Sequence, residues 1–182
     1  MIRIGIVGCG RILASHLRGY RLLREAGVDD FRITALCSLE EDEARMYLRR
    51  GEGPPQRAAV SDIPGDPLAT GDEYLSDFQD DVEVEVYTDF RRMTAEAKID
   101  AVNDFTTHAL HHQVAAAAFE QGKHLLTQKP LAVTIRAARR MCEEAEAQGL
   151  TFGVFENARF RPATRHLRWL FDSGPGGRLQ MV

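Results

Sequence analysis

Residues 2–13 read Ile-Arg-Ile-Gly-Ile-Val-Gly-Cys-Gly-Arg-Ile-Leu, a short apolar strand that runs into a glycine-rich turn and then into a helical pattern. This order predicts the phosphate-binding turn of a dinucleotide-binding βαβ unit. Gly8 permits the tight turn, because glycine takes a positive φ without steric cost. Gly10 leaves room for a pyrophosphate, which the amides from Arg11 onward would face from a helix N-terminus. Leu13 stands at the third glycine position of the fingerprint, so an ordinary strand–turn–helix remains the alternative.

Composition places the chain among ordinary soluble globular proteins with one sizeable core, since 44% of its 182 residues are hydrophobic and 27% are charged. A net charge of -4 argues against nucleic acid as the main partner. No apolar run approaches the ~20 residues of a membrane span, and the N-terminus enters a strand too early for a signal peptide. Cys9, Cys37 and Cys142 form no metal or disulfide framework. We therefore expect a cytoplasmic protein that does not bind membranes.

Apolar runs and helical periodicities alternate along the chain. This alternation predicts an α/β fold: a Rossmann-like, doubly wound, mostly parallel sheet with helices on both faces. After the first strand, we expect strands over residues 31–37, 82–87, 100–105, 123–127 and 151–155. Helices are expected over residues 11–25, 40–49, 109–121, 135–148 and 162–171. Alternating Val and Glu favour a sheet edge for residues 82–87.

Residues 51–81 interrupt this rhythm with four of the seven prolines, four glycines, and eight acidic residues against the single Arg57. So long a connection is unusual within a compact domain. We interpret it as a solvated, partly mobile insertion. The alternative is a lid or a contact surface.

The end of the second strand normally sets the choice of dinucleotide, because an Asp or Glu there binds the ribose 2′-hydroxyl and selects NAD. Ser38 occupies this position. Without a carboxylate, cofactor choice should be relaxed or lean to NADP, although Glu40 and Glu41 are close. Alternatively, Ser38 caps the following helix.

Two further groups carry polar chemistry. The first consists of His108, His111 and His112 near Asp104. Their spacing could place them around a metal ion, which would allow a metal hydrolase. We favour histidines that line a pocket or cap a helix, and we expect no metal. The second, Lys129 before Pro130, ends a predicted strand, where ligands bind in open α/β sheets. This lysine could reach a nicotinamide or a substrate hydroxyl, or it could be a surface residue of a turn.

Five patterns, in this order along the chain, carry a resemblance to a known family. They are Gly8-Cys9-Gly10-Arg11-Ile12 with His16, Thr106 with His111, Gly122-Lys123-His124, Gln128-Lys129-Pro130-Leu131-Ala132 and Asn157-Ala158-Arg159-Phe160. Together they resemble the Gfo/Idh/MocA family. The resemblance implies a Rossmann domain that binds NAD or NADP, followed by an α+β domain. It also implies action on hydroxyl groups of sugars, polyols and related small molecules.

The resemblance also implies roles for single residues. Lys129 takes the position of the catalytic lysine, while Gln128 stands where the family has a glutamate. The residues expected to bind the cofactor are Gly8, Gly10, Arg11, Ile12, Ser38, Thr106, Thr107, His111, Gln128 and Lys129.

The resulting expectation is the NAD(P)-binding domain of an oxidoreductase over residues 1–177, with the insertion at 51–81. Residues 178–182 would begin a C-terminal substrate domain, which would complete catalysis and through which copies could associate as homo-oligomers. The chain alone would then bind cofactor without turnover. The competing hypothesis is a non-catalytic nucleotide-binding or redox-sensing module.

Overall fold

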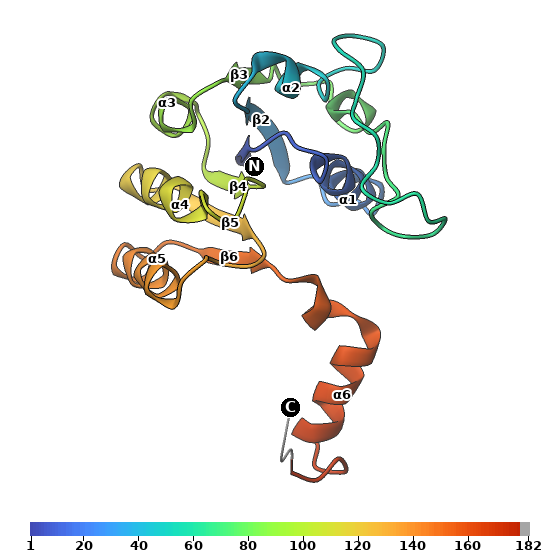
Figure 1. Cartoon of the computed structure of the whole chain (residues 1–182), viewed down its shortest axis with the longest axis vertical. Helices are drawn as coiled ribbons and strands as arrows, with labels where there is room; N and C mark the ends of the chain where they lie inside the picture. The colour runs from blue at the N-terminus through green and yellow to red at the C-terminus, as the bar shows by residue number, and fades with distance from the viewer. Residues whose placement is uncertain (179–182) are drawn as a thin grey trace.

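The computed structural model describes residues 1–178 and contains a six-stranded sheet in the order β3-β2-β1-β4-β5-β6, with every neighbouring pair parallel (Figure 1). The strands are β1 (Ile2–Val7), β2 (Phe31–Cys37), β3 (Glu85–Tyr87), β4 (Ala101–Asp104), β5 (His124–Gln128) and β6 (Phe152–Phe155). The chain order reverses between β1 and β4. In such sheets the carboxyl ends of the strands at this switch point line the ligand crevice.

Helices cover both faces of the sheet, which confirms the predicted fold class (Figure 1). α1 (Leu13–Glu25) packs on one face, and α3 (Phe90–Glu96), α4 (His111–Glu120) and α5 (Ile135–Ala147) pack on the other. The remaining helices are α2 (Glu41–Arg45), α6 (Pro162–Asp172) and the short 3-10 helices η1 (Leu75–Asp77) and η2 (Asn157–Phe160). α1 forms because Leu13, Leu17 and Tyr20 recur on one face and are buried there.

Each face of the sheet has its own apolar core. The α1 side contains Ile6, Leu13, Leu17, Ile33, Leu36, Tyr47 and Leu75, and the α4 side contains Val102, Met93, Val114, Phe119, Leu125 and Met141. β2, which is covered on both faces, is buried at six of its seven positions, as is typical of inner strands of parallel sheets. The edge position predicted for residues 82–87 is confirmed, although β3 is shorter than expected.

Several predicted boundaries were wrong. α1 begins at Leu13 and not at Arg11, because the glycine turn extends through Ile12. The helix expected over residues 40–49 ends at Arg45, and the chain then turns so that Met46 and Tyr47 enter the core. α3 was not expected at all. Apart from Arg178, the strand expected over residues 178–182 lies outside the described residues.

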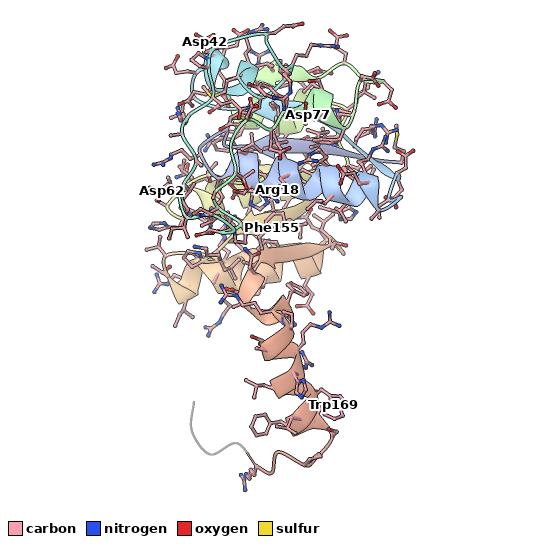
Figure 2. The ribbon with its side chains drawn as sticks, turned by 90° about the vertical axis from the view of Figure 1, so that its right-hand side faces the viewer. Arg18, Asp42, Asp62, Asp77, Phe155 and Trp169 are labelled. Carbon is pink, nitrogen blue, oxygen red and sulfur yellow. The ribbon has the colours of Figure 1, made fainter. Side chains whose placement is uncertain are left out.

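The later part of the insertion, from Thr70 to Gln79, is anchored along α1 and β2, whereas no residue from 51 to 69 is buried, so the expected solvated character fits only the first part. Figure 2 shows its chain passing α1 near Arg18, whose guanidinium donates to Thr70 at 3.5 Å. Glu73, Leu75 and Gln79 are all buried. The Gln79 side-chain amide bonds both the N–H and the carbonyl of Ile33, at 3.0 and 2.7 Å, and so takes the place of a neighbouring strand beside β2.

α6 leaves the body of the molecule after β6 and carries exposed apolar side chains (Figures 1 and 2). Phe160, just before it, and Leu167 and Trp169 on it are 66%, 54% and 60% exposed. Within residues 1–178, none of the helices has the length and apolar character that crossing a membrane requires.

Candidate active site

The glycine turn connects β1 to α1 at the switch point of the sheet. Gly8 has a φ of +96°, and a Cβ there would lie 2.7 Å from the backbone carbon of Phe105, just beyond β4. Its N–H donates to the carbonyl of Cys37 at the end of β2. Only glycine satisfies both the positive φ and this close approach. Gly8 therefore sets the spacing of the strand ends rather than offering a surface to a ligand.

Gly10 has the opposite environment, because a Cβ added there would meet no atom within 4 Å. In the part of the chain that the structure describes, the N–H groups of Gly10, Arg11 and Ile12 donate to no backbone oxygen. These amides precede the N-terminus of α1, where the helix dipole favours an anion. The turn thus has the open space and the unused donors that a pyrophosphate requires.

Arg11 lies at this turn, but its guanidinium is engaged by the insertion. It donates to the carbonyl oxygens of Ala58 and Ala59 at 3.2 and 2.6 Å. The side chain is exposed and its partners are neutral, so an anionic ligand could recruit it. The insertion therefore borders the phosphate-binding turn.

At the end of β2, the carboxylate next to Ser38 belongs to Glu43 and not to Glu40 or Glu41, the two acids that the sequence indicated. The Ser38 hydroxyl donates to Glu43 Oε2 at 2.5 Å, and Glu43 forms an ion pair with Arg57 of the insertion. Ser38 does not cap α2, whose N-cap residue is Glu40. The alternative of a capping serine is therefore wrong, while Ser38 is still the residue at the strand end and Glu43 adds a carboxylate beside it.

The end of β4 is organised around Asp104, which is fully buried. One of its oxygens accepts from the Thr106 N–H at 2.9 Å and from the Thr106 hydroxyl at 2.6 Å, and the other accepts from the Thr127 hydroxyl at 2.9 Å. This carboxylate ties the ends of β4 and β5 together. Thr106 is half-buried and Thr107 is exposed, so the two line the sheet edge beside the glycine turn.

The three histidines that follow β4 separate in space. His111 is 1% exposed, and its ring nitrogens lie 3.0 Å from the Pro130 carbonyl and 3.3 Å from the Thr106 carbonyl. It therefore links β4 to the turn after β5, while His108 and His112 are exposed. Among residues 1–178, no three His, Cys, Asp or Glu side chains gather as metal ligands, so the metal hydrolase alternative gains no support.

The end of β5 places Lys129 at the surface, with its backbone fixed by Gln128. The Gln128 Oε1 accepts from the Lys129 N–H at 2.9 Å, and the Gln128 Nε2 lies 2.8 Å from His16 Nε2. His16 stacks on Phe105 with ring centroids 3.9 Å apart. Burial lowers the pKa of His16 to about 4, so the ring is neutral and accepts this hydrogen bond at neutral pH.

Sequence reasoning missed Glu43, Arg57 and Tyr47 at this site. Tyr47 is buried and donates from its hydroxyl to the Gly10 carbonyl at 3.0 Å. The signal for Glu43 was present as an acid in the first turn of the helix after β2. Arg57 and Tyr47 left no local signal, because their partners lie 14 and 37 residues away.

A comparison of the sequence with models of protein families finds a match. The sequence model of the Gfo/Idh/MocA group, described as "Oxidoreductase family, NAD-binding Rossmann fold", matches residues 68–156. The resemblance to the Gfo/Idh/MocA family is confirmed. This match covers β3 to β6, and the glycine turn lies N-terminal to it.

Curated relatives of this family extend the likeness over the whole chain. The 1,5-anhydro-D-fructose reductase of Ensifer adhaerens is 35% identical over 91 residues, which are 50% of this chain and 27% of that protein. Inositol 2-dehydrogenase 2 of Saccharopolyspora erythraea is 26% identical over 185 residues, which are 100% of this chain and 44% of that protein. The chain thus spans less than half the length of these relatives.

A solved structure of the same kind shows the same fold. Scyllo-inositol dehydrogenase from Lactobacillus casei, solved with bound NAD(H) and scyllo-inositol, superposes with a TM-score of 0.68. The match covers 97% of this chain and 42% of that one, at 24% sequence identity. At this identity the comparison establishes the Rossmann fold.

Proposed function

We propose that this chain binds a nicotinamide dinucleotide, NAD or NADP, and forms the cofactor domain of an oxidoreductase that acts on hydroxyl groups of sugars or polyols. The observation that carries the proposal is the Gly8–Gly10 turn, which combines open space at Gly10 with unused amides at the N-terminus of α1. The family description and the names of the relatives support this function over a non-catalytic module. The unpaired cysteines suit a cytoplasmic location.

Within this function, each strand end contributes a different part of the site. The amides of Gly10, Arg11 and Ile12 would receive the phosphates, and Ser38 with Glu43 would face the adenosine ribose. Thr106, Thr107 and Gln128 would line the crevice toward the nicotinamide, which supplies the hydride chemistry when bound. His111 is a positioning residue here, since its ring nitrogens already face backbone carbonyls.

Lys129 is the catalytic residue of the proposal. Its exposed ammonium could polarise a substrate hydroxyl or carbonyl and transfer the proton at that oxygen as the hydride moves. Gln128 holds its backbone in place, so the lysine emerges from a fixed point at the end of β5. The action on substrate would also need residues from outside the Rossmann domain.

We further propose that residues 1–177 are this Rossmann domain and that the substrate domain begins at residue 178. Two observations support the division. The relatives extend well beyond the region that matches this chain. The apolar side chains of Phe160, Leu167 and Trp169 are exposed on and beside α6, at the end of the domain away from the sheet.

The phosphate site can be tested by replacing Gly10 with Val. The φ of Gly10 lies outside the left-handed region and its surroundings are open, so the variant should fold but should fill the pyrophosphate space. We expect its affinity for NADH and NADPH, followed by cofactor fluorescence, to fall by about tenfold or more. Gly19→Val on α1 is the matched control, because Gly19 also has no atom near its Cβ position. Unchanged cofactor affinity in Gly10→Val would contradict the proposed site.

A further inference from the structure

The insertion and α2 meet at the end of β2 in a chain of three polar side chains. Ser38, only 9% exposed, donates to one oxygen of Glu43, and the Arg57 guanidinium pairs with the other. Glu43 is itself largely shielded, with 25% of its side chain exposed. A carboxylate held on both oxygens has a fixed position, so this acid is oriented before any ligand arrives.

This carboxylate lies beside the glycine turn as well as beside β2. The Gly8 N–H bonds the Cys37 carbonyl at 2.8 Å, which places Ser38 directly next to the turn. The charges of Glu43 and Arg57 also act on the Cys9 thiol, whose pKa is raised mainly by burial, further by Cys37 and by Glu43, and is lowered by Arg57. The carboxylate therefore occupies the region between the β2 end and the phosphate turn. In dinucleotide folds the adenosine ribose lies there.

The charge of this acid decides which ribose it can accept. The hydrogen bond from Ser38, together with Arg57, holds the pKa of Glu43 below its usual range, so the group is ionised at neutral pH. An ionised carboxylate accepts from a ribose 2′-hydroxyl but repels a 2′-phosphate. Arg57 is the single cation of the insertion, and its pairing with Glu43 leaves it little capacity to attract that phosphate.

We propose that Glu43 selects NAD over NADP, and that Arg57 is a positioning residue through which the insertion sets the orientation of this carboxylate. This inference rests on the proposed cofactor-binding function and deepens it. It gives the insertion a defined role at the adenosine half of the site. It also replaces the leaning to NADP that Ser38 by itself indicates.

The test measures the affinities of the intact chain for NADH and for NADPH in the same buffer. We expect the wild type to favour NADH by about tenfold or more. Glu43→Gln keeps the shape and an acceptor for Ser38 but removes the charge, so the preference should fall to within about threefold through tighter NADPH binding. Glu41→Gln, on the same helix in an exposed pair with Arg45, is the matched control and should leave the ratio unchanged.

Arg57→Gln tests whether Arg57 positions the Glu43 carboxylate or itself binds a 2′-phosphate. As a positioning residue, its loss should weaken NADH binding several-fold without producing a preference for NADPH. The inference is overturned if the wild type prefers NADPH and Arg57→Gln abolishes that preference, because Arg57 then binds the 2′-phosphate. An NADH preference unchanged in Glu43→Gln also overturns it. If the wild type binds neither dinucleotide, the proposed function fails and this inference fails with it.

Discussion

Gly8 and Gly10 lie two residues apart and are needed for opposite reasons. At Gly8 the β4 end approaches within 2.7 Å of a would-be Cβ, whereas at Gly10 nothing lies within 4 Å. The first glycine is required by the protein's own packing, whereas the second is required only by the ligand that we propose. At the same scale, His16 connects the turn to Lys129, because it stacks on Phe105 and bonds Gln128.

His16 should make stability depend on pH. Its folded pKa is about 4 and its ordinary value is 6.5, so the unfolded chain binds the proton more readily. The contribution of His16 to the free energy of unfolding should be at its maximum above about pH 6.5. It should fall by about 2–3 kcal/mol as the pH decreases toward 4. Urea unfolding across this range measures the effect. His16→Phe keeps an aromatic ring against Phe105 and should flatten this part of the profile, and an identical slope in that variant would assign the dependence to other groups.

At the scale of elements, the insertion is attached to α1 by arginines that lie on one side of the helix. Arg21 binds both oxygens of Glu73 at 2.9 Å, and the Glu73 side chain is 11% exposed. Arg24 donates to the Phe78 carbonyl, and Arg18 donates to the Thr70 hydroxyl. Among the acids of the insertion, Glu73 thus pairs with α1, while Asp72 and Asp77 pair with Arg50.

Removing one of these attachments should loosen the insertion without unfolding the sheet. Arg21→Gln leaves the shielded Glu73 carboxylate unpaired, so we expect a loss of about 1–3 kcal/mol in urea unfolding. Trypsin should also cut faster at Arg57, the only Lys or Arg in residues 51–81. Arg92→Gln, which breaks an exposed pair with Glu96, is the control and should cost less than about 0.5 kcal/mol. Equal effects of the two variants would show that the Arg21 pair does not anchor the segment.

At the scale of the whole molecule, the residues of the candidate site all lie at the carboxyl ends of the strands, and none comes from α6. The strand ends supply the backbone donors, the carboxylate and the lysine of the proposed site, whereas α6 extends away from the sheet (Figure 1) and carries exposed apolar side chains. We therefore expect the 182-residue chain to bind reduced cofactor and to turn over no sugar or polyol. Turnover by this chain alone would contradict the proposed division into domains.

Lys129 should reveal its role when a substrate domain is present. In a protein that joins this chain to such a domain, Lys129→Ala should lower kcat by about 10²–10⁴, the usual contribution of a positioned proton donor. Cofactor affinity should change little, because the lysine acts at the substrate oxygen. Lys123→Ala, at the opposite end of β5, is the control. Steady-state kinetics with cofactor titration separates the two effects, and an unchanged kcat would make Lys129 an ordinary turn residue.

The sequence by itself determined the fold class, the six strands and the position of the glycine turn. These features depend on local patterns: apolar runs for strands, helical periodicity, and glycines at fixed offsets after β1. The exposed Lys129 at a strand end followed from the same alternation. The short α2 and the missed α3 show the limit, because the end of α2 is set by the burial of Met46 and Tyr47 and not by a local stop signal.

Only the tertiary structure decided what surrounds these residues. Glu43 reaches Ser38 because α2 turns back over the β2 end, and Arg57 reaches Glu43 because the insertion is anchored on α1. His111 is engaged by carbonyls 5 and 19 residues away in sequence. Such contacts join segments whose separation is set by packing of the whole chain, and a carboxylate or a guanidinium has the same local sequence signature whether it faces water or a partner. The sequence therefore placed the glycine turn, while the packing of the insertion decided which charges, Glu43 and Arg57, stand beside the end of β2.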